Sequence, residues 1–142
     1  MIDKKSNRKM GKGATLIADN TLVKGDIEFD DQLFVNGAVE GNIYADPESN
    51  ATLVLSDIGS VSGEIRVPYV ILNGTVNGDV YSGVRVELAD KARIKGNVYY
   101  KLIEMQLGAK VDGQLVYAEN DGAVDNVHRL PKSVDSNSPE RD

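Results

Sequence analysis

The chain has 142 residues, enough for about one domain. It carries 16 Lys and Arg against 22 Asp and Glu, a formal net charge of -6, and a single His. Hydrophobic residues make up 41% of the chain but aromatic residues only 6%, so we expect a core of small aliphatic side chains. With no Cys, the chain has no disulfide, thiol nucleophile or zinc-thiolate site. Its longest apolar run, 67–72, is far shorter than the about 20 residues of a membrane-spanning helix.

Residues 1–15 are basic, with five Lys or Arg against one Asp. The segment lacks the apolar stretch of a secretory signal, so we expect it to stay on the protein as a flexible N-terminal arm. Two interpretations of this arm are favoured: a solvated tail, or electrostatic docking to anionic lipid. The residues that would bind the membrane are Met1, Ile2, Lys4, Lys5, Arg8 and Lys9. We expect no nucleic-acid binding, because the arm has no aromatic residue for stacking and residues 16–117 carry a net charge of -7.

The other end of the chain, 118–142, is rich in Asp, Asn, Ser, Gly and Pro and is predicted to be a flexible acidic tail. Within it Val124, Val127 and Leu130 recur at helical spacing, so a short helix that caps the preceding domain is an alternative. His128, the only His, lies in this tail and is expected to be solvated. One His cannot build the multi-His metal site of hexapeptide-repeat enzymes, and a Ser-His pair is not expected here.

Between these tails, residues 16–117 contain six copies of one pattern: a β-branched residue, any residue, Gly, a polar residue, and an aliphatic residue. Most of the intervals between the glycines are 15 to 18 residues long. One interval of 22 residues contains the turn-forming cluster 46–50, which we interpret as a loop inserted at a corner. The repeated glycines are Gly25, Gly41, Gly63, Gly78, Gly96 and Gly113.

Alternating segments such as Val86-Glu87-Leu88 separate the glycines, and this period of two indicates strands. A repeat of about 17 residues has room for three strands of roughly four to six residues, with sharp corners at glycine, but not for a crossover helix. The prediction is therefore an all-β, single-domain, triangular parallel β-helix of about six turns. The alternative is an antiparallel sandwich, with Asn36-Gly37 and Asn73-Gly74 as hairpin turns. Six copies at a nearly constant interval favour the solenoid.

Four segments of the repeat are long enough to resemble a known family. They are ATLIA running into VKGDI (14–27), LFVNGAVEGNI (33–43), VILNGTVNGDV (70–80) and ELADKARIKGNV (87–98). They resemble the bactofilins, bacterial cytoskeletal proteins that form polymers, and the resemblance covers residues 14–117. It implies a right-handed β-helix that assembles end to end, without nucleotide, into filaments that have no polarity. It also implies a cytoplasmic scaffold, in some members attached to the inner membrane, that positions cell-wall enzymes and influences cell shape.

The first and last turns of such a solenoid expose strand edges and an apolar cross-section. No capping element is evident at the N-terminal end, so we expect both ends to bind further copies of the chain. The predicted polymer interface consists of Leu16, Ile17, Leu22 and Val23 in the first turn and Val111, Leu115 and Tyr117 in the last. In a monomer the same residues would simply be the outermost core layer.

Signals for other functions are weak. The chain has no phosphate-binding Gly-x-x-x-x-Gly-Lys-Ser/Thr motif, and its many acids are expected to form a solvated face, so we predict neither an enzyme nor a cofactor or metal. Tyr44, Tyr81 and Tyr99 should point outward at equivalent positions as a ladder over the backbone. The alternative function is a non-polymerising β-helix that binds or modifies glycans through these tyrosines and the acids. Partner proteins would dock on the 46–50 loop or on the tails.

Overall fold

The computed structural model describes residues 13–118 of the chain. The predicted membrane-binding residues Met1, Ile2, Lys4, Lys5, Arg8 and Lys9 lie outside this range. So do the predicted capping segment 124–130 and His128. The described region is all-β, and it contains no helix that could cross a membrane.

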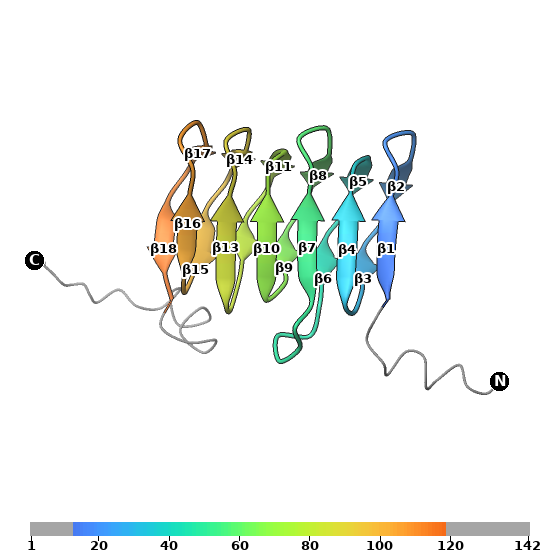
Figure 1. The fold of residues 1–142 in the computed structure, drawn as a ribbon, viewed down its shortest axis with the longest axis horizontal. Coiled ribbons are helices and arrows are strands. Elements are labelled where there is room, and N and C mark those ends of the chain that lie inside the picture. The colour runs from blue at the N-terminus through green and yellow to red at the C-terminus, as the bar shows by residue number, and fades with distance from the viewer. Residues whose placement is uncertain (1–12, 119–142) are drawn as a thin grey trace, which may run out of the picture.

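Eighteen short strands wind through three sheets, one strand per sheet in every turn (Figure 1). The first sheet, sheet A, comprises β1 (Ala14–Ile17), β4 (Gln32–Val35), β7 (Thr52–Leu55), β10 (Tyr69–Leu72), β13 (Arg85–Leu88) and β16 (Ile103–Met105). Sheet B comprises β2 (Leu22–Lys24), β5 (Ala38–Glu40), β8 (Ser60–Ser62), β11 (Thr75–Asn77), β14 (Arg93–Lys95) and β17 (Lys110–Asp112). Sheet C comprises β3 (Ile27–Glu28), β6 (Ile43–Tyr44), β9 (Ile65–Arg66), β12 (Val80–Tyr81), β15 (Val98–Tyr100) and β18 (Leu115–Tyr117).

Every strand pairs in parallel with the equivalent strands of the neighbouring turns. In sheet B, for example, Val76 of β11 is aligned with Val61 of β8 and with Ile94 of β14. This topology confirms the predicted six-turn parallel β-helix and rules out the antiparallel sandwich. The predicted strand length of four to six residues is wrong, because the strands have two to four residues and the corners take up the rest of each repeat.

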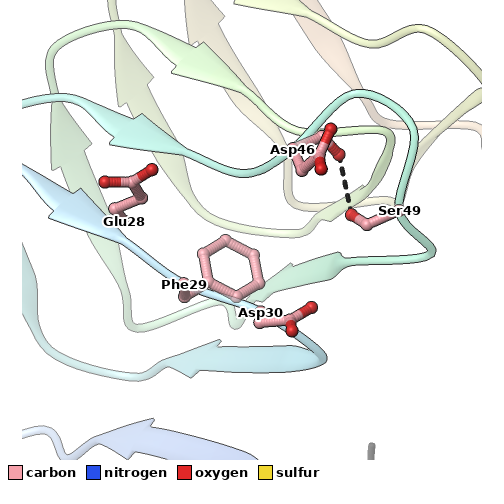
Figure 2. Close-up of a pocket in the computed structure, with 5 residues that line it drawn as sticks. All are labelled: Glu28, Phe29, Asp30, Asp46 and Ser49. Carbon is pink, nitrogen blue, oxygen red and sulfur yellow. Dashed lines mark hydrogen bonds between the residues drawn. The ribbon is translucent and has the colours of Figure 1, made fainter. Parts of the chain in front are cut away.

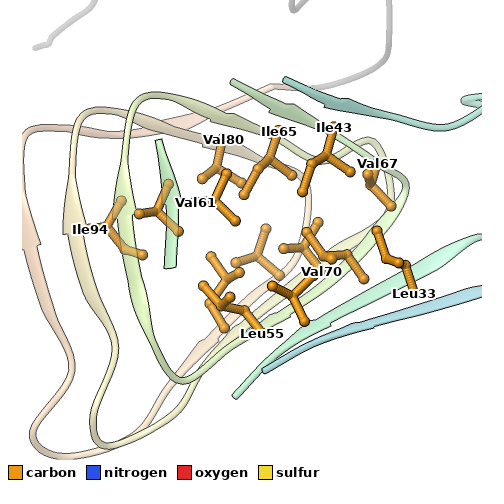
Figure 3. Close-up of a cluster of buried hydrophobic side chains, with 14 of the residues drawn as sticks. Leu33, Ile43, Leu55, Val61, Ile65, Val67, Val70, Val80 and Ile94 are labelled. Carbon is orange, nitrogen blue, oxygen red and sulfur yellow. The ribbon is translucent and has the colours of Figure 1, made fainter. Parts of the chain in front are cut away.

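The core is a stack of aliphatic side chains that point into the prism from all three sheets (Figure 3). One column in sheet B runs through Val39, Val61, Val76 and Ile94, each at most 1% exposed. Val98 and Val80 of sheet C and Leu72 of sheet A are equally buried. Full burial of such a side chain contributes roughly 1.5 to 3 kcal/mol. No turn is thick enough to bury its own side chains, so each depends on the turns above and below it.

The repeated glycines lie one above another at the corner between sheets B and C. A Cβ atom at Gly41 would lie 2.1 Å from the carbonyl oxygen of Gly25, and one at Gly78 would lie 2.2 Å from that of Gly63. Only glycine lets the backbones of successive turns approach this closely. The corner between sheets A and B is made by Asn36-Gly37 in the second turn and by Asn73-Gly74 in the fourth, so these dipeptides turn between sheets rather than within a hairpin.

The 46–50 cluster lies between β6 and β7, at the corner between sheets C and A, as predicted (Figure 1). Its turn is closed locally. The Ser49 backbone N–H donates to the Asp46 carbonyl oxygen at 3.0 Å, and the Asp46 side chain accepts from the Glu48 backbone N–H at 2.9 Å. The insertion lengthens the second turn without disturbing the register, because Gln32 of β4 still aligns with Thr52 of β7.

Candidate functional site: the two ends of the solenoid

The C-terminal end of the region 13–118 is a layer of core side chains that no further turn of this region covers. Val98 in β15 is fully buried, whereas Leu115, its partner in β18, is 43% exposed. Met105 in β16 is likewise 43% exposed, although its partner Leu88 in β13 is 1% exposed. The complete layer consists of Ile103, Met105, Val111, Leu115 and Tyr117. All five side chains are apolar or aromatic, so this end can bury further surface against another molecule.

The N-terminal end is built the same way but is less exposed. Its inward positions are Thr15, Ile17, Val23, Ile27 and Phe29, which lie over core residues of the second turn. Ile17 is 7% exposed and belongs to the core, while Val23, Ile27 and Phe29 are half-buried against it. Thr15 is the one polar residue of the layer.

Two residues predicted for this end lie elsewhere. Leu16 is aligned with the outward-facing Phe34, so it points away from the prism on sheet A and is 59% exposed. Leu22 is aligned with Ala38 on the outer face of sheet B, where it lines a shallow groove with Ile58. These two positions therefore belong to side faces and not to the end cross-section. The alternation of inward and outward residues within each strand is the reason.

Each end also has three strands that pair on one side only within the described part of the chain: β1, β2 and β3 at one end, and β16, β17 and β18 at the other. Edge strands carry unpaired N–H and C=O groups, and natural proteins normally cover or disrupt them. A second strand laid against such an edge gains hydrogen bonds as well as apolar contacts. The ends can therefore act as binding sites for another β-structure.

A polar ladder runs beside the corner glycines and ties successive turns together. The backbone N–H of Asn42 donates to Asp26 Oδ1 at 2.9 Å, and that of Glu64 donates to Asn42 Oδ1 at 2.8 Å. The same contact joins Asn97 to Asp79 at 2.9 Å and Gln114 to Asn97 at 3.0 Å. Most of the polar residues that follow the glycine thus have a structural role. The interpretation of the acids as a solvated face did not include this role.

The tyrosines predicted to face outward lie in one column on the outer side of sheet C, where Tyr44 and Tyr81 are half-buried and Tyr99 is buried at 9% exposed. Glu28, Tyr44, Arg66, Tyr81 and Tyr99 occupy equivalent positions in successive turns. The Tyr81 and Tyr99 rings stack with centroids 4.5 Å apart and an interplanar angle of 2°. The Arg66 guanidinium carbon lies 3.9 Å from the Tyr81 ring centroid. Because β9 and β15 flank β12, these two neighbours cover both faces of the Tyr81 ring.

A model of one protein family matches residues 15–116, which is nearly the whole solenoid. That family is Bactofilin, described as polymer-forming cytoskeletal proteins. The chain belongs to the bactofilin family. The predicted resemblance is thereby confirmed.

Two curated bactofilins of Myxococcus xanthus (strain DK1622) are similar to this chain. Bactofilin BacO is 27% identical over 101 residues, which cover 71% of this chain and 77% of BacO. Bactofilin BacP is also 27% identical over 101 residues, and there the similar region covers only 40% of BacP. This chain therefore spans less than half the length of BacP. No solved structure matches the chain significantly.

The two ends of this bactofilin solenoid differ in charge. Residues 13–50, which form the first two turns, contain eight Asp or Glu and one Lys. Residues 83–118, which form the last two, contain six Lys or Arg and four Asp or Glu. The net charge thus changes from -7 at the N-terminal end to +2 at the C-terminal end. Contacts at the two ends should respond differently to salt.

Acids of the first two turns contribute to a shallow pocket beside the 46–50 loop (Figure 2). It is lined by Glu28, Phe29, Asp30, Asp46 and Ser49, and the Ser49 hydroxyl donates to the Asp46 carbonyl oxygen at 2.7 Å. Within residues 13–118 no group of three or more His, Asp or Glu is placed to hold a metal ion. The role of this loop as a docking point stays a prediction.

Sequence reasoning missed five members of the end layers: Thr15, Ile27, Phe29, Ile103 and Met105. Their signal was present, since each occupies the inward phase of an alternating segment. Ile103 and Met105 flank Glu104 just as Val86 and Leu88 flank Glu87. Extending the register of the central turns to the ends would have found them.

Proposed function

We propose that this bactofilin assembles end to end into filaments without nucleotide. The observation that supports the proposal best is the C-terminal layer, where residues equivalent to fully buried core positions are about half exposed. A second solenoid placed on this layer would bury Met105, Leu115 and Tyr117 and would pair the exposed edges. Burial of the remaining exposed area is worth on the order of 1 kcal/mol for each such side chain. Assembly needs no nucleotide hydrolysis, because the folded protomer already presents the apolar layers and strand edges that would join.

Like ends are proposed to meet, C-terminal with C-terminal and N-terminal with N-terminal. Each junction then has two-fold symmetry, and alternation of the two junctions gives a filament without polarity. The difference between the ends supports two junctions of unequal strength. The C-terminal junction, with five apolar or aromatic side chains and little net charge, is proposed to be the stronger one.

The cellular role is proposed at the level of the family: a cytoplasmic scaffold, not an enzyme, that positions cell-wall enzymes and so influences cell shape. Binding of the basic segment 1–12 to anionic inner-membrane lipid would place the scaffold on the cytoplasmic face of that membrane. The alternative glycan-binding role is less favoured, because one of its three predicted tyrosines has no open ring face. Sugars bind to the open faces of aromatic rings, and both faces of Tyr81 are already covered by Arg66 and Tyr99.

Electron microscopy and high-speed sedimentation of the purified protein without nucleotide test the proposal. We expect filaments from the wild type and non-sedimenting protein from Leu115→Lys, which places a charge in the C-terminal layer. Val116→Lys is the matched control, because Val116 lies on the same edge strand but points outward beside Tyr99. It should still polymerise. Undiminished filaments from Leu115→Lys, or no filaments from the wild type, would refute end-to-end assembly.

A further inference from the structure

The outer face of sheet A carries an apolar stripe that the core does not require. Leu16, Phe34, Val54 and Ile71 are aligned in four successive strands, at the position between the two inward residues of each strand. Leu16 is exposed, and the other three are partly exposed to solvent. In the next two turns the same position is occupied by Glu87 and Glu104. The stripe therefore ends where charges begin.

The face around the stripe is uncharged as well. The second outward column of these four strands consists of Ala14, Gln32, Thr52 and Tyr69. By contrast, the first four turns of sheet B have Lys24 and Glu40 at outward positions, and those of sheet C have Glu28 and Arg66. Of the three described sheets, only sheet A presents four consecutive turns without an outward charge. Beyond the stripe, Arg85 pairs with both Glu87 and Glu104.

We propose that this face is a lateral interface at which two filaments of this chain pair through sheet A. The inference rests on the proposed function, because it needs filaments. A second copy is the partner that fits the chemistry, since an apolar, uncharged face is complementary to itself under two-fold symmetry. Elsewhere on the first two turns, eight acids against one Lys would repel another copy. Sheet A is the side from which these acidic turns can approach each other most closely.

The size of the face explains why the pairing would need filaments. Four strands spaced about 4.8 Å apart, each rising about 3.3 Å per residue over four residues, make a face on the order of 250 Å². Two such faces bury about 500 Å² in total, which is well below the roughly 1,200 Å² of a small stable interface. Isolated protomers should not pair through it. In a filament every protomer contributes one face, and the weak contacts add along the polymer.

The geometry of pairing sets one further condition. Sheet A of successive protomers must lie on one side of the filament. A two-fold axis that passes through sheet A at each end-to-end junction meets this condition. The stripe starts at Leu16 on β1, the edge strand of the N-terminal end, so the stripes of two protomers joined at that end would run into one another.

Differential sedimentation and electron microscopy of three proteins test the inference. The wild type should form paired filaments or bundles that pellet at low speed. Val54→Lys, which places a charge in the middle of the stripe, should form single filaments and lose the low-speed pellet while it still pellets at high speed. Ser62→Lys is the matched control, because it adds the same charge to the same turn on the outer face of sheet B, next to Glu40. It should pair like the wild type.

A second variant controls for an effect of misfolding. Val54→Thr keeps the shape and the strand preference of the residue, and it should reduce the low-speed pellet less than Val54→Lys does. Pairing of Val54→Lys at the wild-type level would overturn the inference, and so would single filaments from the wild type. Deletion of residues 1–12 should leave pairing unchanged. If only the deletion protein pairs, segment 1–12 and not a second copy occupies the face.

Vesicles of phosphatidylglycerol and phosphatidylethanolamine distinguish a membrane partner. Val54→Lys should bind them as well as the wild type does. Loss of vesicle binding together with unchanged pairing would assign the face to lipid and overturn the inference. Absence of filaments from every protein would instead refute the proposed function, so the two failures can be told apart.

Discussion

In most core columns of this bactofilin, the central turns and the end turns contain the same kind of residue and differ in what covers it. Val76 in β11 is fully buried, whereas Val111, two turns further along the same column, is only half-buried. The backbone register is identical. Burial is therefore a property of the stack and not of the single turn, and a turn at the end of the stack has an unfinished core.

The two ends differ from each other as well. The C-terminal layer is entirely apolar or aromatic and lies in turns of net charge +2, whereas the N-terminal layer includes Thr15 and lies in turns of net charge -7. A solenoid with one strongly apolar end and one acidic end should make two unequal junctions. Four predictions examine these differences, beginning with the largest expected effect.

Replacement of a corner glycine by alanine should destabilise the protein more in a central turn than in the first turn, and this is the largest difference that we expect. Gly78 and Gly25 both have positive φ, 152° and 132°, so backbone strain of about 1 to 2 kcal/mol applies to both. A Cβ at Gly78 would also lie 2.2 Å from the Gly63 carbonyl oxygen, whereas at Gly25 nothing lies within 4 Å. In urea unfolding, Gly78→Ala should lose at least about 4 kcal/mol, and Gly25→Ala only the strain. Equal losses would contradict the close approach of successive turns.

Shortening a core side chain in the middle and at the end of one column should show directly that the end layer is incompletely covered. In a Leu115→Lys background, which keeps the C-terminal ends of protomers apart, Val76→Ala should lower the free energy of unfolding by about 2 kcal/mol, because it leaves a cavity. Val111→Ala should cost less than half as much, since Val111 is already partly hydrated. Urea unfolding followed by circular dichroism measures both. A larger loss at Val111 than at Val76 would show that the last turn is covered.

Salt should act on the junctions unequally. Two N-terminal ends bring two acidic surfaces together, so we expect this junction to weaken at low ionic strength, where the screening length reaches about 30 Å at 0.01 M. Sedimentation velocity should then detect dimers joined by their C-terminal ends, and filaments should grow as NaCl is added. Deletion of residues 1–12, whose net charge is +4, should increase the salt requirement. Filaments that dissociate on addition of salt would contradict this charge assignment.

The smallest effect concerns Tyr81 in the outer column of sheet C. Burial raises its pKa above 10.0, with further contributions from Tyr99, Glu64 and Asp79, while Arg66 acts in the opposite direction. Above pH 10 the unfolded chain therefore loses this proton first. The stability contribution of Tyr81 is complete below that pH and is lost as the pH rises through its folded-state pKa. Spectroscopic titration should show the raised pKa of Tyr81 as a signal that Tyr81→Phe removes and that Arg66→Gln shifts to still higher pH.

Much of the fold could be predicted from the sequence, because the corner glycine and the period of two are local signals that recur in every turn. Strand lengths could not be, since nothing local tells how many residues a corner such as Asn73-Gly74 uses. The end layers were predicted in part. Leu16 and Leu22 were assigned to the cross-section because they are apolar, although their phase places them outside. The sheet A stripe joins residues 17 to 20 positions apart, so only the register between turns brings Leu16, Phe34, Val54 and Ile71 together.

The central claim, that unfinished ends complete each other, is tested most directly by covalent trapping within filaments. The chain has no Cys, so one introduced thiol reports on one end. With a short thiol-specific cross-linker, filaments of Leu115→Cys should give covalent dimers, filaments of Val23→Cys should do the same, and Val76→Cys, buried in the middle, should give none. Monomers alone from both end variants would contradict the claim, and so would dimers that form only when the two end variants are mixed, because that pattern requires head-to-tail contacts.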